Sequence, residues 1–158
     1  MNKDIIGRKK EQESLIRFIQ SDESEFIAIY GRRRVGKTFL VRKLLGEQLA
    51  FYVTGMDNVT MQDQLLNFTL ELRKFSGKEI PVPENWLYAF EALSQYLESL
   101  PSGKKIIFMD ELPWMDTPKS NFISALEHFW NSWASARSDI KLIVCGSATS
   151  WMIDKLIN

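Results

Sequence analysis

The segment from Gly31 to Thr38 has the residue types and the spacing that phosphate binding requires. It reads Gly-Arg-Arg-Arg-Val-Gly-Lys-Thr, a glycine followed by four residues and then Gly-Lys-Thr. The two glycines allow a tight turn whose backbone N–H groups can approach an anion closely. The side chain of Lys37 would reach the β- and γ-phosphates of a nucleotide, and the hydroxyl of Thr38 would hold Mg²⁺. The segment therefore predicts a P-loop that binds ATP and Mg²⁺.

The flanks of this segment agree with that prediction. An apolar run, Phe26–Tyr30, precedes it and is typical of a buried strand, and the pattern of residues 39–45 predicts a helix. The N-terminus of that helix would add its positive dipole end to the phosphate site. We expect nucleotide contacts along the whole loop and from the residue after it: Gly31, Arg32, Arg33, Arg34, Val35, Gly36, Lys37, Thr38 and Phe39. The three arginines have a second interpretation, in which their side chains point outward and the loop works through its backbone.

A pair of carboxylates follows a second apolar run. Ile106–Met109 is continuously apolar, which suits a strand buried on both faces, and it leads into Asp110 and Glu111. Asp110 would hold the Mg²⁺ shell, usually through water. Glu111 would polarise the attacking water as a general base, and its position directly after Asp110 favours hydrolysis over transfer to an acceptor substrate. By themselves the two residues would be an ordinary solvated acidic pair, but a P-loop upstream favours the functional interpretation.

A third polar cluster follows the last apolar run, residues 140–145. This cluster, residues 146–150, contains Ser147 and Thr149, and a side chain that senses the γ-phosphate would lie there. Ligands of open parallel sheets bind at the carboxyl ends of the strands. All three polar clusters follow strands, so we expect them to meet at one edge of a sheet.

The remaining pattern supplies the elements that position these clusters. Strands are expected at residues 26–30, 49–54, 104–109 and 140–145, and helices at about 12–19, 39–45, 60–75, 85–100 and 119–137. The alternation predicts an α/β fold with a doubly wound parallel sheet. The aromatic residues Trp86, Phe90 and Tyr96 of segment 85–100 are expected in the core rather than around a ligand. His128 and Cys145 are expected to be structural.

The composition is consistent with a single domain. The chain has 158 residues, 45% of them hydrophobic, with 20 basic and 20 acidic side chains. With a net charge of zero, the chain as a whole has no electrostatic attraction to nucleic acid or to an anionic membrane. The single cysteine, Cys145, excludes an internal disulfide, and no apolar run approaches the length of a membrane span. We expect a cytoplasmic protein.

These motifs together resemble the archaeal-type ATPase family, a group of AAA+/STAND-like P-loop ATPases. The resemblance covers nearly the whole chain and rests on five motifs: Ile6-Gly7-Arg8 with Glu11, Gly31 to Thr38, Asp110-Glu111-Leu112-Pro113-Trp114, Phe129-Trp130-Asn131-Ser132-Trp133, and Cys145-Gly146-Ser147-Ala148 with Trp151-Met152. It implies that Ile6, Gly7 and Arg8 lie near the adenine and that Ser147 or Thr149 is the sensor. Related ATPases often have Asn or Thr at the sensor position, and no arginine finger can be assigned.

The resemblance also implies the sheet and its extent. The fold would be a three-layer P-loop NTPase sandwich with strand order 5-1-4-3-2. Residues 1–158 would be an ATPase core that lacks the fifth strand and a helical lid. The strand at Phe26–Tyr30 would then lie at an exposed edge, so we expect self-association through that edge and slow ATP hydrolysis.

Two classes of function follow. The first is an ATP-hydrolysing switch or motor domain, in which Lys37, Mg²⁺ and a partner's arginine neutralise charge. The second is a nucleotide-dependent binding module for DNA or a protein partner, with little turnover. An effect of DNA or of a partner protein on ATP turnover would distinguish the two.

Overall fold

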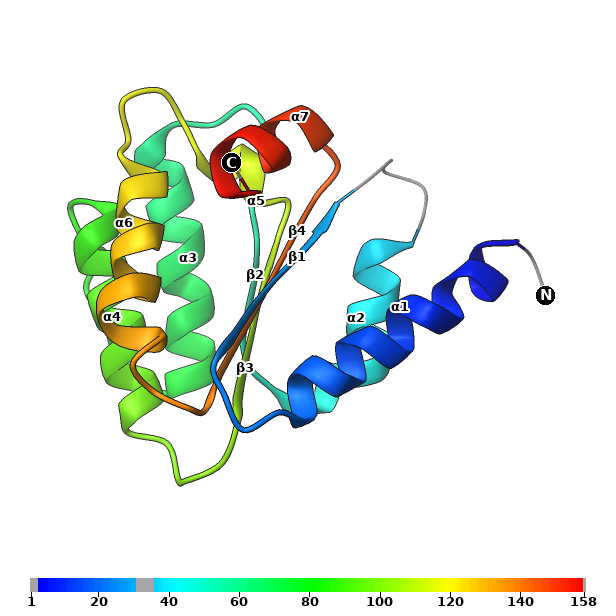
Figure 1. The fold of residues 1–158 in the computed structure, drawn as a ribbon. Helices are drawn as coiled ribbons and strands as arrows, with labels where there is room; N and C mark the ends of the chain where they lie inside the picture. The colour runs from blue at the N-terminus through cyan, green and yellow to red at the C-terminus, as the bar shows by residue number, and fades with distance from the viewer. Residues whose placement is uncertain (1–2, 31–35, 158) are drawn as a thin grey trace.

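The described part of the chain, residues 3–30 and 36–157 of a computed structural model, forms one parallel sheet between two layers of helices (Figure 1). Its strands are β1 (Glu25–Tyr30), β2 (Leu49–Thr54), β3 (Lys105–Asp110) and β4 (Ile140–Gly146). Its α-helices are α1 (Lys3–Gln20), α2 (Lys37–Leu45), α3 (Met61–Ser76), α4 (Trp86–Glu98), α5 (Leu112–Met115), α6 (Phe122–Phe129) and α7 (Thr149–Met152). A 3₁₀ turn, η2 (Gly46–Gln48), follows α2, and π-helical turns η3 (Trp130–Ala134) and η4 (Ile153–Ile157) follow α6 and α7.

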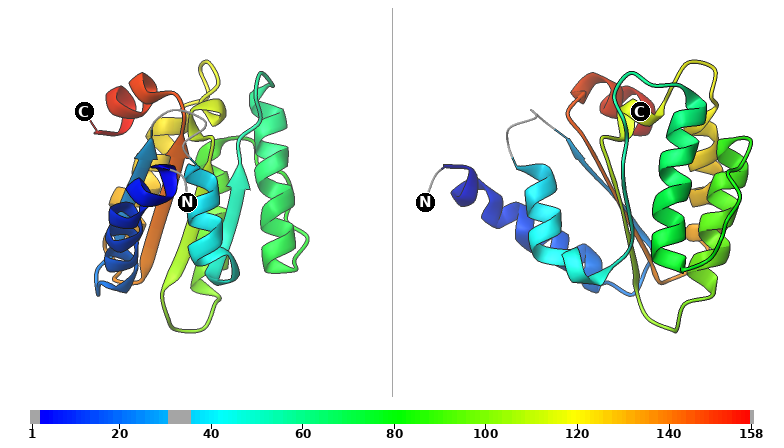
Figure 2. Two further views of the ribbon diagram at one scale, coloured as in Figure 1. Left: turned by 90° about the vertical axis from the view of Figure 1, so that its right-hand side faces the viewer. Right: turned by 180° about the vertical axis from the view of Figure 1, so that it is seen from behind.

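The strand order confirms the predicted sheet for the four strands that are described. The order is β1-β4-β3-β2, and all three pairings are parallel. Tyr30 at the end of β1 pairs with Gly146, and Thr54 at the end of β2 pairs with Asp110. The carboxyl ends of the strands therefore lie along one edge, and the short helices α5 and α7 lie over that edge (Figures 1 and 2).

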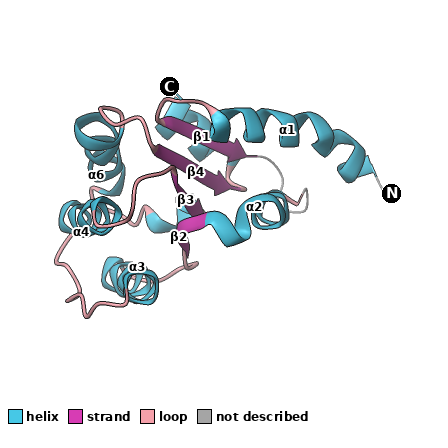
Figure 3. Ribbon diagram, turned by 90° about the horizontal axis from the view of Figure 1, so that it is seen from below, coloured by secondary structure: helices cyan, strands magenta, loops and turns pink. Residues whose placement is uncertain are grey.

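The two helical layers explain why β3 and β4 read as continuous apolar runs. Helices α3, α4 and α6 cover one face of the sheet and α1 and α2 cover the other (Figure 3). Along β3, Ile107 and Met109 join the core under α3, α4 and α6, whereas Ile106 and Phe108 join the core under α1 and α2. Because successive side chains of a strand point to opposite faces, a strand covered on both sides is apolar along most of its length.

Local capping sets the ends of two helices close to their predicted bounds. The Thr60 hydroxyl oxygen accepts a hydrogen bond from the N–H of Asp63 at 3.1 Å, and Asn85 Oδ1 accepts one from the N–H of Tyr88 at 3.0 Å. Each satisfies an N–H group that the first turn of a helix leaves without a partner. Gly77 ends α3 at φ 71°, a conformation that glycine adopts without steric cost.

Two local predictions were wrong, and one short helix was not predicted. The helix expected over residues 119–137 begins only at Phe122 and changes to the π-helical turn η3 at Trp130. Its expected first residues cannot be helical because Lys119 and Asn121 have positive φ angles of 59° and 57°. Residues 112–115, which follow β3, form the short helix α5, for which the sequence made no prediction. The first helix begins at Lys3, well before the amphipathic pattern that signalled it.

None of the helices in residues 3–30 and 36–157 is long and apolar enough to cross a membrane.

Candidate functional site

The N-terminus of α2 lies at the carboxyl edge of the sheet, directly after the predicted phosphate loop. Gly36 is its N-cap residue, with φ 76° and ψ 28°, and its carbonyl accepts the N–H of Leu40 at 2.9 Å. Neither an acidic residue nor a side-chain cap occupies the described first turn of this nine-residue helix. The first N–H groups of a helix have no intrahelical acceptor, so this end of α2 is suited to an anion.

The two predicted metal ligands are in direct contact. The hydroxyl of Thr38, in the first turn of α2, donates a hydrogen bond of 2.5 Å to Oδ2 of Asp110. The other carboxylate oxygen, Oδ1, accepts the backbone N–H of Glu111 at 2.9 Å. Asp110 is 5% exposed, so its carboxylate is fixed against the hydroxyl rather than free in solvent.

This oxygen pair fits Mg²⁺ better than a metal that needs a cage of side chains. No group of three or more His, Cys, Asp or Glu that could hold a metal lies within the described residues. Mg²⁺ prefers oxygen ligands, keeps several of its waters and is usually held by one or two protein groups together with substrate phosphates. A hydroxyl and a carboxylate in contact, beside a helix N-terminus, match that requirement.

Glu111 follows Asp110 in an unusual backbone conformation. Its φ and ψ are 51° and 46°, in the left-handed region, and it is the N-cap residue of α5. The side chain is half-buried. A left-handed conformation is uncommon for a residue other than glycine and turns the chain sharply at the end of β3.

The segment after β4 is packed against the segment after β3. A Cβ atom added to Gly146 would lie 2.7 Å from Cδ of Pro113, so this close approach requires a glycine. The indole N–H of Trp151 donates to Oδ2 of Asp116 at 3.0 Å. Ser147, the predicted sensor, is half-buried, and in the sequence it lies between Gly146 and Trp151. The polar clusters after β3 and β4 therefore form one structural unit.

Some predicted site residues cannot be compared with the structure. Residues 31–35, which include Gly31, Arg32, Arg33, Arg34 and Val35, lie outside the described part of the chain. The backbones of Ile6, Gly7 and Arg8 belong to α1, and those of Lys37 and Thr149 begin α2 and α7, but their side chains lie outside the description. Phe39 is described: its ring is 65% exposed, and Nζ of Lys43 lies 5.6 Å from the ring centre.

Sequence reasoning missed Gln64, whose side chain is almost completely buried on α3. It contacts the backbone of both Met56, in the loop after β2, and Trp114, in α5. The signal was present in the sequence, because Gln64 lies four residues before Phe68 and eight before Leu72, at the helical spacing of these buried residues. A glutamine on the apolar face of a helix needs buried hydrogen-bond partners, which the sequence alone does not identify.

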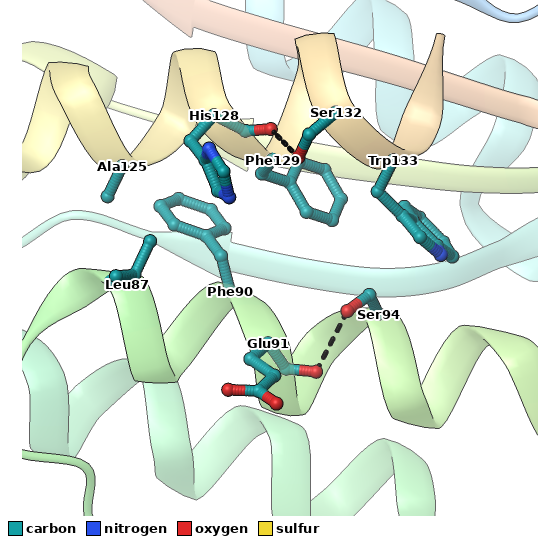
Figure 4. Close-up of a pocket in the computed structure, with 9 residues that line it drawn as sticks. All are labelled: Leu87, Phe90, Glu91, Ser94, Ala125, His128, Phe129, Ser132 and Trp133. Carbon is teal, nitrogen blue, oxygen red and sulfur yellow. Dashed lines mark hydrogen bonds between the residues drawn. The ribbon is translucent and has the colours of Figure 1, made fainter. Parts of the chain in front are cut away.

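A groove between α4 and α6 lies on the outer helical layer (Figure 4). Phe90, Phe129 and Trp133 form much of its apolar lining, and the imidazole of His128 lies at its side. His128 is exposed, so it is not part of the packed core. None of the residues predicted to bind the nucleotide lines this groove.

A family model described as an ATPase domain predominantly from Archaea matches residues 5–158. An uncharacterized protein of Methanocaldococcus jannaschii is 30% identical over 154 residues, 98% of this chain and 32% of that protein. An uncharacterized ATP-binding protein of the same archaeon is 48% identical over 41 residues, 26% of this chain and 70% of that protein. The chain thus spans about a third of the length of the first of these relatives.

Solved structures share the fold at lower sequence identity. A Walker-type ATPase of Pyrococcus abyssi aligns with 95% of this chain and 47% of its own, with a TM-score of 0.65 and 17% identity. The ORC2 protein of Aeropyrum pernix, solved as ADPNP–ADP complexes, aligns with 95% of this chain and 44% of its own, with a TM-score of 0.60 and 21% identity. Drosophila ORC bound to DNA gives a TM-score of 0.61 and 15% identity over 95% of this chain and 81% of that chain.

Proposed function

This chain belongs to the family of ATPase domains found predominantly in Archaea, and we propose that it binds ATP with Mg²⁺ at the carboxyl edge of its sheet and hydrolyses it. The proposal takes residues 1–158 as one ATPase core. The phosphates would lie at the N-terminus of α2 and the adenine near Ile6, Gly7 and Arg8.

The observation that carries the proposal is the hydrogen bond between Thr38 and Asp110. It brings a hydroxyl from the predicted phosphate loop and a carboxylate from the end of β3 together beside a helix N-terminus. Those are the parts that P-loop enzymes use to hold the metal of a Mg²⁺–nucleotide. The pair would hold Mg²⁺, which would neutralise phosphate charge when it is bound.

Each remaining residue has a role that follows from its chemistry. The ammonium group of Lys37 would pair with the phosphates. Glu111 would accept a proton from the attacking water, because it is the carboxylate next to the one that holds the metal. The hydroxyl of Ser147 would contact the γ-phosphate, with Thr149 as the other candidate. The amides of the phosphate loop would orient the phosphate chain before reaction and so lower the barrier.

Hydrolysis would be coupled to a conformational change through the segments after β3 and β4. Pro113 packs against Gly146, and Asp116 accepts the indole N–H of Trp151. A shift of Ser147 on loss of the γ-phosphate would therefore be transmitted to the segment that carries Glu111. Packed elements of this kind convert a small displacement at a ligand into a larger rearrangement.

The proposal is tested with the chain and ATP, with and without Mg²⁺. Calorimetry should show ATP binding that Mg²⁺ strengthens, and release of inorganic phosphate should depend on Mg²⁺. A chain that binds no ATP under either condition would contradict the nucleotide site itself. Binding without phosphate release would contradict hydrolysis only.

A second candidate is a nucleotide-dependent binding module for DNA or a protein, with little turnover. It is supported by the fold similarity to a Drosophila ORC structure bound to DNA. If this candidate is right, Mg²⁺–ATP should raise the affinity for a DNA duplex while phosphate release stays slow. Equal duplex binding with and without nucleotide would count against it.

The edge strand β1 supports the proposal that the chain self-associates. Within the described residues β1 pairs only with β4, and its residues are partly exposed whereas those of β3 and β4 are all buried. Unpaired N–H and C=O groups along an edge can pair with a strand from another copy. Light scattering should show a mass that rises with concentration, and a strictly monomeric chain would contradict this proposal.

A further inference from the structure

We propose that Gln64 is a positioning residue that holds the backbone of Glu111 in the conformation required for hydrolysis. The inference rests on the proposed function, because it assigns Gln64 a role through the general base. Gln64 lies on α3, outside the loops that carry the candidate site, and its side chain is 1% exposed.

The amide of Gln64 connects two separate loops. Its Oε1 accepts the backbone N–H of Met56 at 3.1 Å, and its Nε2 donates to the carbonyl of Met56 at 2.5 Å. The same Nε2 donates to the carbonyl of Trp114 at 3.0 Å. The oxygen and both N–H groups of one buried side chain are thus used on the backbone that follows β2 and on the backbone of α5.

Both of these loops contact the backbone of Glu111. Next to Met56, the N–H of Gly55 donates to the carbonyl of Asp110 at 2.9 Å. A Cβ atom added to Gly55 would lie 2.5 Å from the carbonyl oxygen of Glu111, so the two backbones are in tight contact. From the other side, the N–H of Trp114 donates to that carbonyl at 3.1 Å. Gln64 therefore connects the two segments that enclose the peptide group of Glu111.

Glu111 needs such support because its backbone conformation is unfavourable for a residue with a side chain. Its φ of 51° persists only where the surrounding structure imposes it. This conformation decides the direction in which the carboxylate leaves the chain, and a general base works only within hydrogen-bond reach of its water. If the connection through Gln64 were lost, the loop and α5 could move apart and Glu111 could relax.

A glutamine at this buried position favours a role in positioning the backbone of Glu111 over a role in packing the core. The neighbouring buried residues of α3, Leu65 and Phe68, are apolar. A glutamine buried among them loses its hydration, which only its backbone hydrogen bonds offset. Gln64→Met retains the length and the packing of the side chain but removes every polar contact to Met56 and Trp114, so it separates the two roles.

The experiment compares Gln64→Met with Gln62→Met, which makes the same chemical change at an exposed position of the same helix. We measure kcat, KM and the Kd of Mg²⁺–ATP, together with amide hydrogen exchange of the free chain over residues 110–116. For Gln64→Met we expect kcat to fall at least about tenfold, with KM and Kd within about twofold of wild type. Exchange of residues 111–116 should become faster, and Gln62→Met should match wild type in every measurement.

A second variant guards against a folding defect. Gln64→Asn keeps the amide but is one carbon shorter, so it cannot reach both loops, and it should also lower kcat and speed exchange. Unchanged exchange over residues 111–116 in both variants would overturn the inference, as would an unchanged kcat with faster exchange. Parallel losses of Kd and kcat would overturn it as well, because they indicate general loosening of the site. If the wild-type chain itself releases no phosphate, the proposed function fails, and the exchange measurement on the free chain still decides whether Gln64 holds this segment.

Discussion

The hydroxyl of Thr38 donates a 2.5 Å hydrogen bond to Oδ2 of Asp110, although 72 residues separate them in the sequence. The contact joins the first turn of α2 to the end of β3. Helix α2 lies in the connection from β1 to β2, and β4 and β3 lie between these two strands in the sheet. The connection therefore passes the end of β3. This hydrogen bond keeps the two oxygens that we expect to bind the metal at one place. Metal binding would require little rearrangement of either element.

Thr38→Val should therefore reduce the effect of Mg²⁺ on ATP binding. The substitution keeps the shape but removes the hydroxyl, so one oxygen ligand is lost. We expect Mg²⁺ to strengthen ATP binding roughly tenfold less than in wild type, the scale of one hydrogen bond to a charged group. Thr38→Ser, which keeps the hydroxyl, is the matched control. Calorimetric titrations of ATP with and without Mg²⁺ measure the difference, and equal Mg²⁺ effects in Thr38→Val and wild type would remove Thr38 from the metal site.

Lys37→Ala should remove most of the affinity for ATP while leaving the fold intact. It deletes the side-chain charge that is expected at the β- and γ-phosphates, and charge-assisted hydrogen bonds of this kind are worth about 10- to 100-fold in affinity. Lys74→Ala removes the same charge from an exposed position on α3 and should bind ATP like wild type. Wild-type affinity in Lys37→Ala, measured by calorimetry, would show that the phosphate loop is misassigned.

Glu111→Gln should separate binding from chemistry. The amide keeps the shape of the side chain but cannot accept a proton, so Mg²⁺–ATP binding should persist while phosphate release falls by at least about 100-fold. Asp110→Asn should instead weaken the Mg²⁺-dependent part of binding. Calorimetry and a phosphate-release assay on both variants measure these effects. The opposite pattern, with binding lost in Glu111→Gln and kept in Asp110→Asn, would mean that the two roles are reversed.

Gly55→Ala should destabilise the fold by about 1 to 3 kcal/mol, the usual cost of forcing an extra carbon into a packed site. The new Cβ would lie 2.5 Å from the carbonyl oxygen of Glu111, and backbone there cannot move aside as a flexible side chain can. Gly46→Ala is the control, because its Cβ would meet no atom within 4 Å and its φ of −49° is helical. Urea denaturation should show Gly46→Ala equal to or more stable than wild type. Equal stability of the two variants would contradict the tight contact.

Asp139→Asn should destabilise the chain in a pH-dependent way. Arg137 donates two hydrogen bonds to this carboxylate, and Lys105 donates a third, which lowers the pKa of Asp139 from 3.8 to about 2. Since the folded-state pKa is lowered, the stabilisation is present above pH 3.8 and is lost as the pH falls toward 2. We expect the free energy of unfolding to drop by about 1 to 2 kcal/mol at pH 7, allowing for partial solvent screening.

Urea denaturation of Asp139→Asn and wild type at pH 7 and near pH 2.5 measures that dependence. The difference between the two chains should shrink at the lower pH. A difference that stays constant would show that the ion pairs with Arg137 and Lys105 do not set the stability of the folded state.

Much of the candidate site can be identified from the sequence because its signals are local. The pattern of residues 31–38, the carboxylates after residues 106–109 and the polar cluster after residues 140–145 can each be read within a few neighbours. Strand burial can be read in the same way, because a strand covered on both faces is apolar at most positions. The strand order was expected only from the family resemblance, because a local sequence pattern does not indicate which strands are neighbours in the sheet.

The structure alone decided how distant residues meet. Lys141 is a charged residue within an apolar run, and it is completely buried. Its ammonium group donates to the carbonyls of Ser21 and Glu23. Burial lowers the pKa of Lys141, and only partners supplied by the connection between α1 and β1 make the position tolerable. No periodicity in the neighbouring sequence identifies those partners.

The sequence by itself therefore determined the residue types of the site, the elements that carry them and the faces that these elements bury. The tertiary structure decided the contact of Thr38 with Asp110, the left-handed backbone of Glu111 and the connection that Gln64 makes between two loops. The physical reason is the separation along the sequence over which each kind of signal acts. Hydrophobic periodicity and turn chemistry act between residues a few positions apart, whereas these contacts join segments that become neighbours only when the parallel sheet assembles.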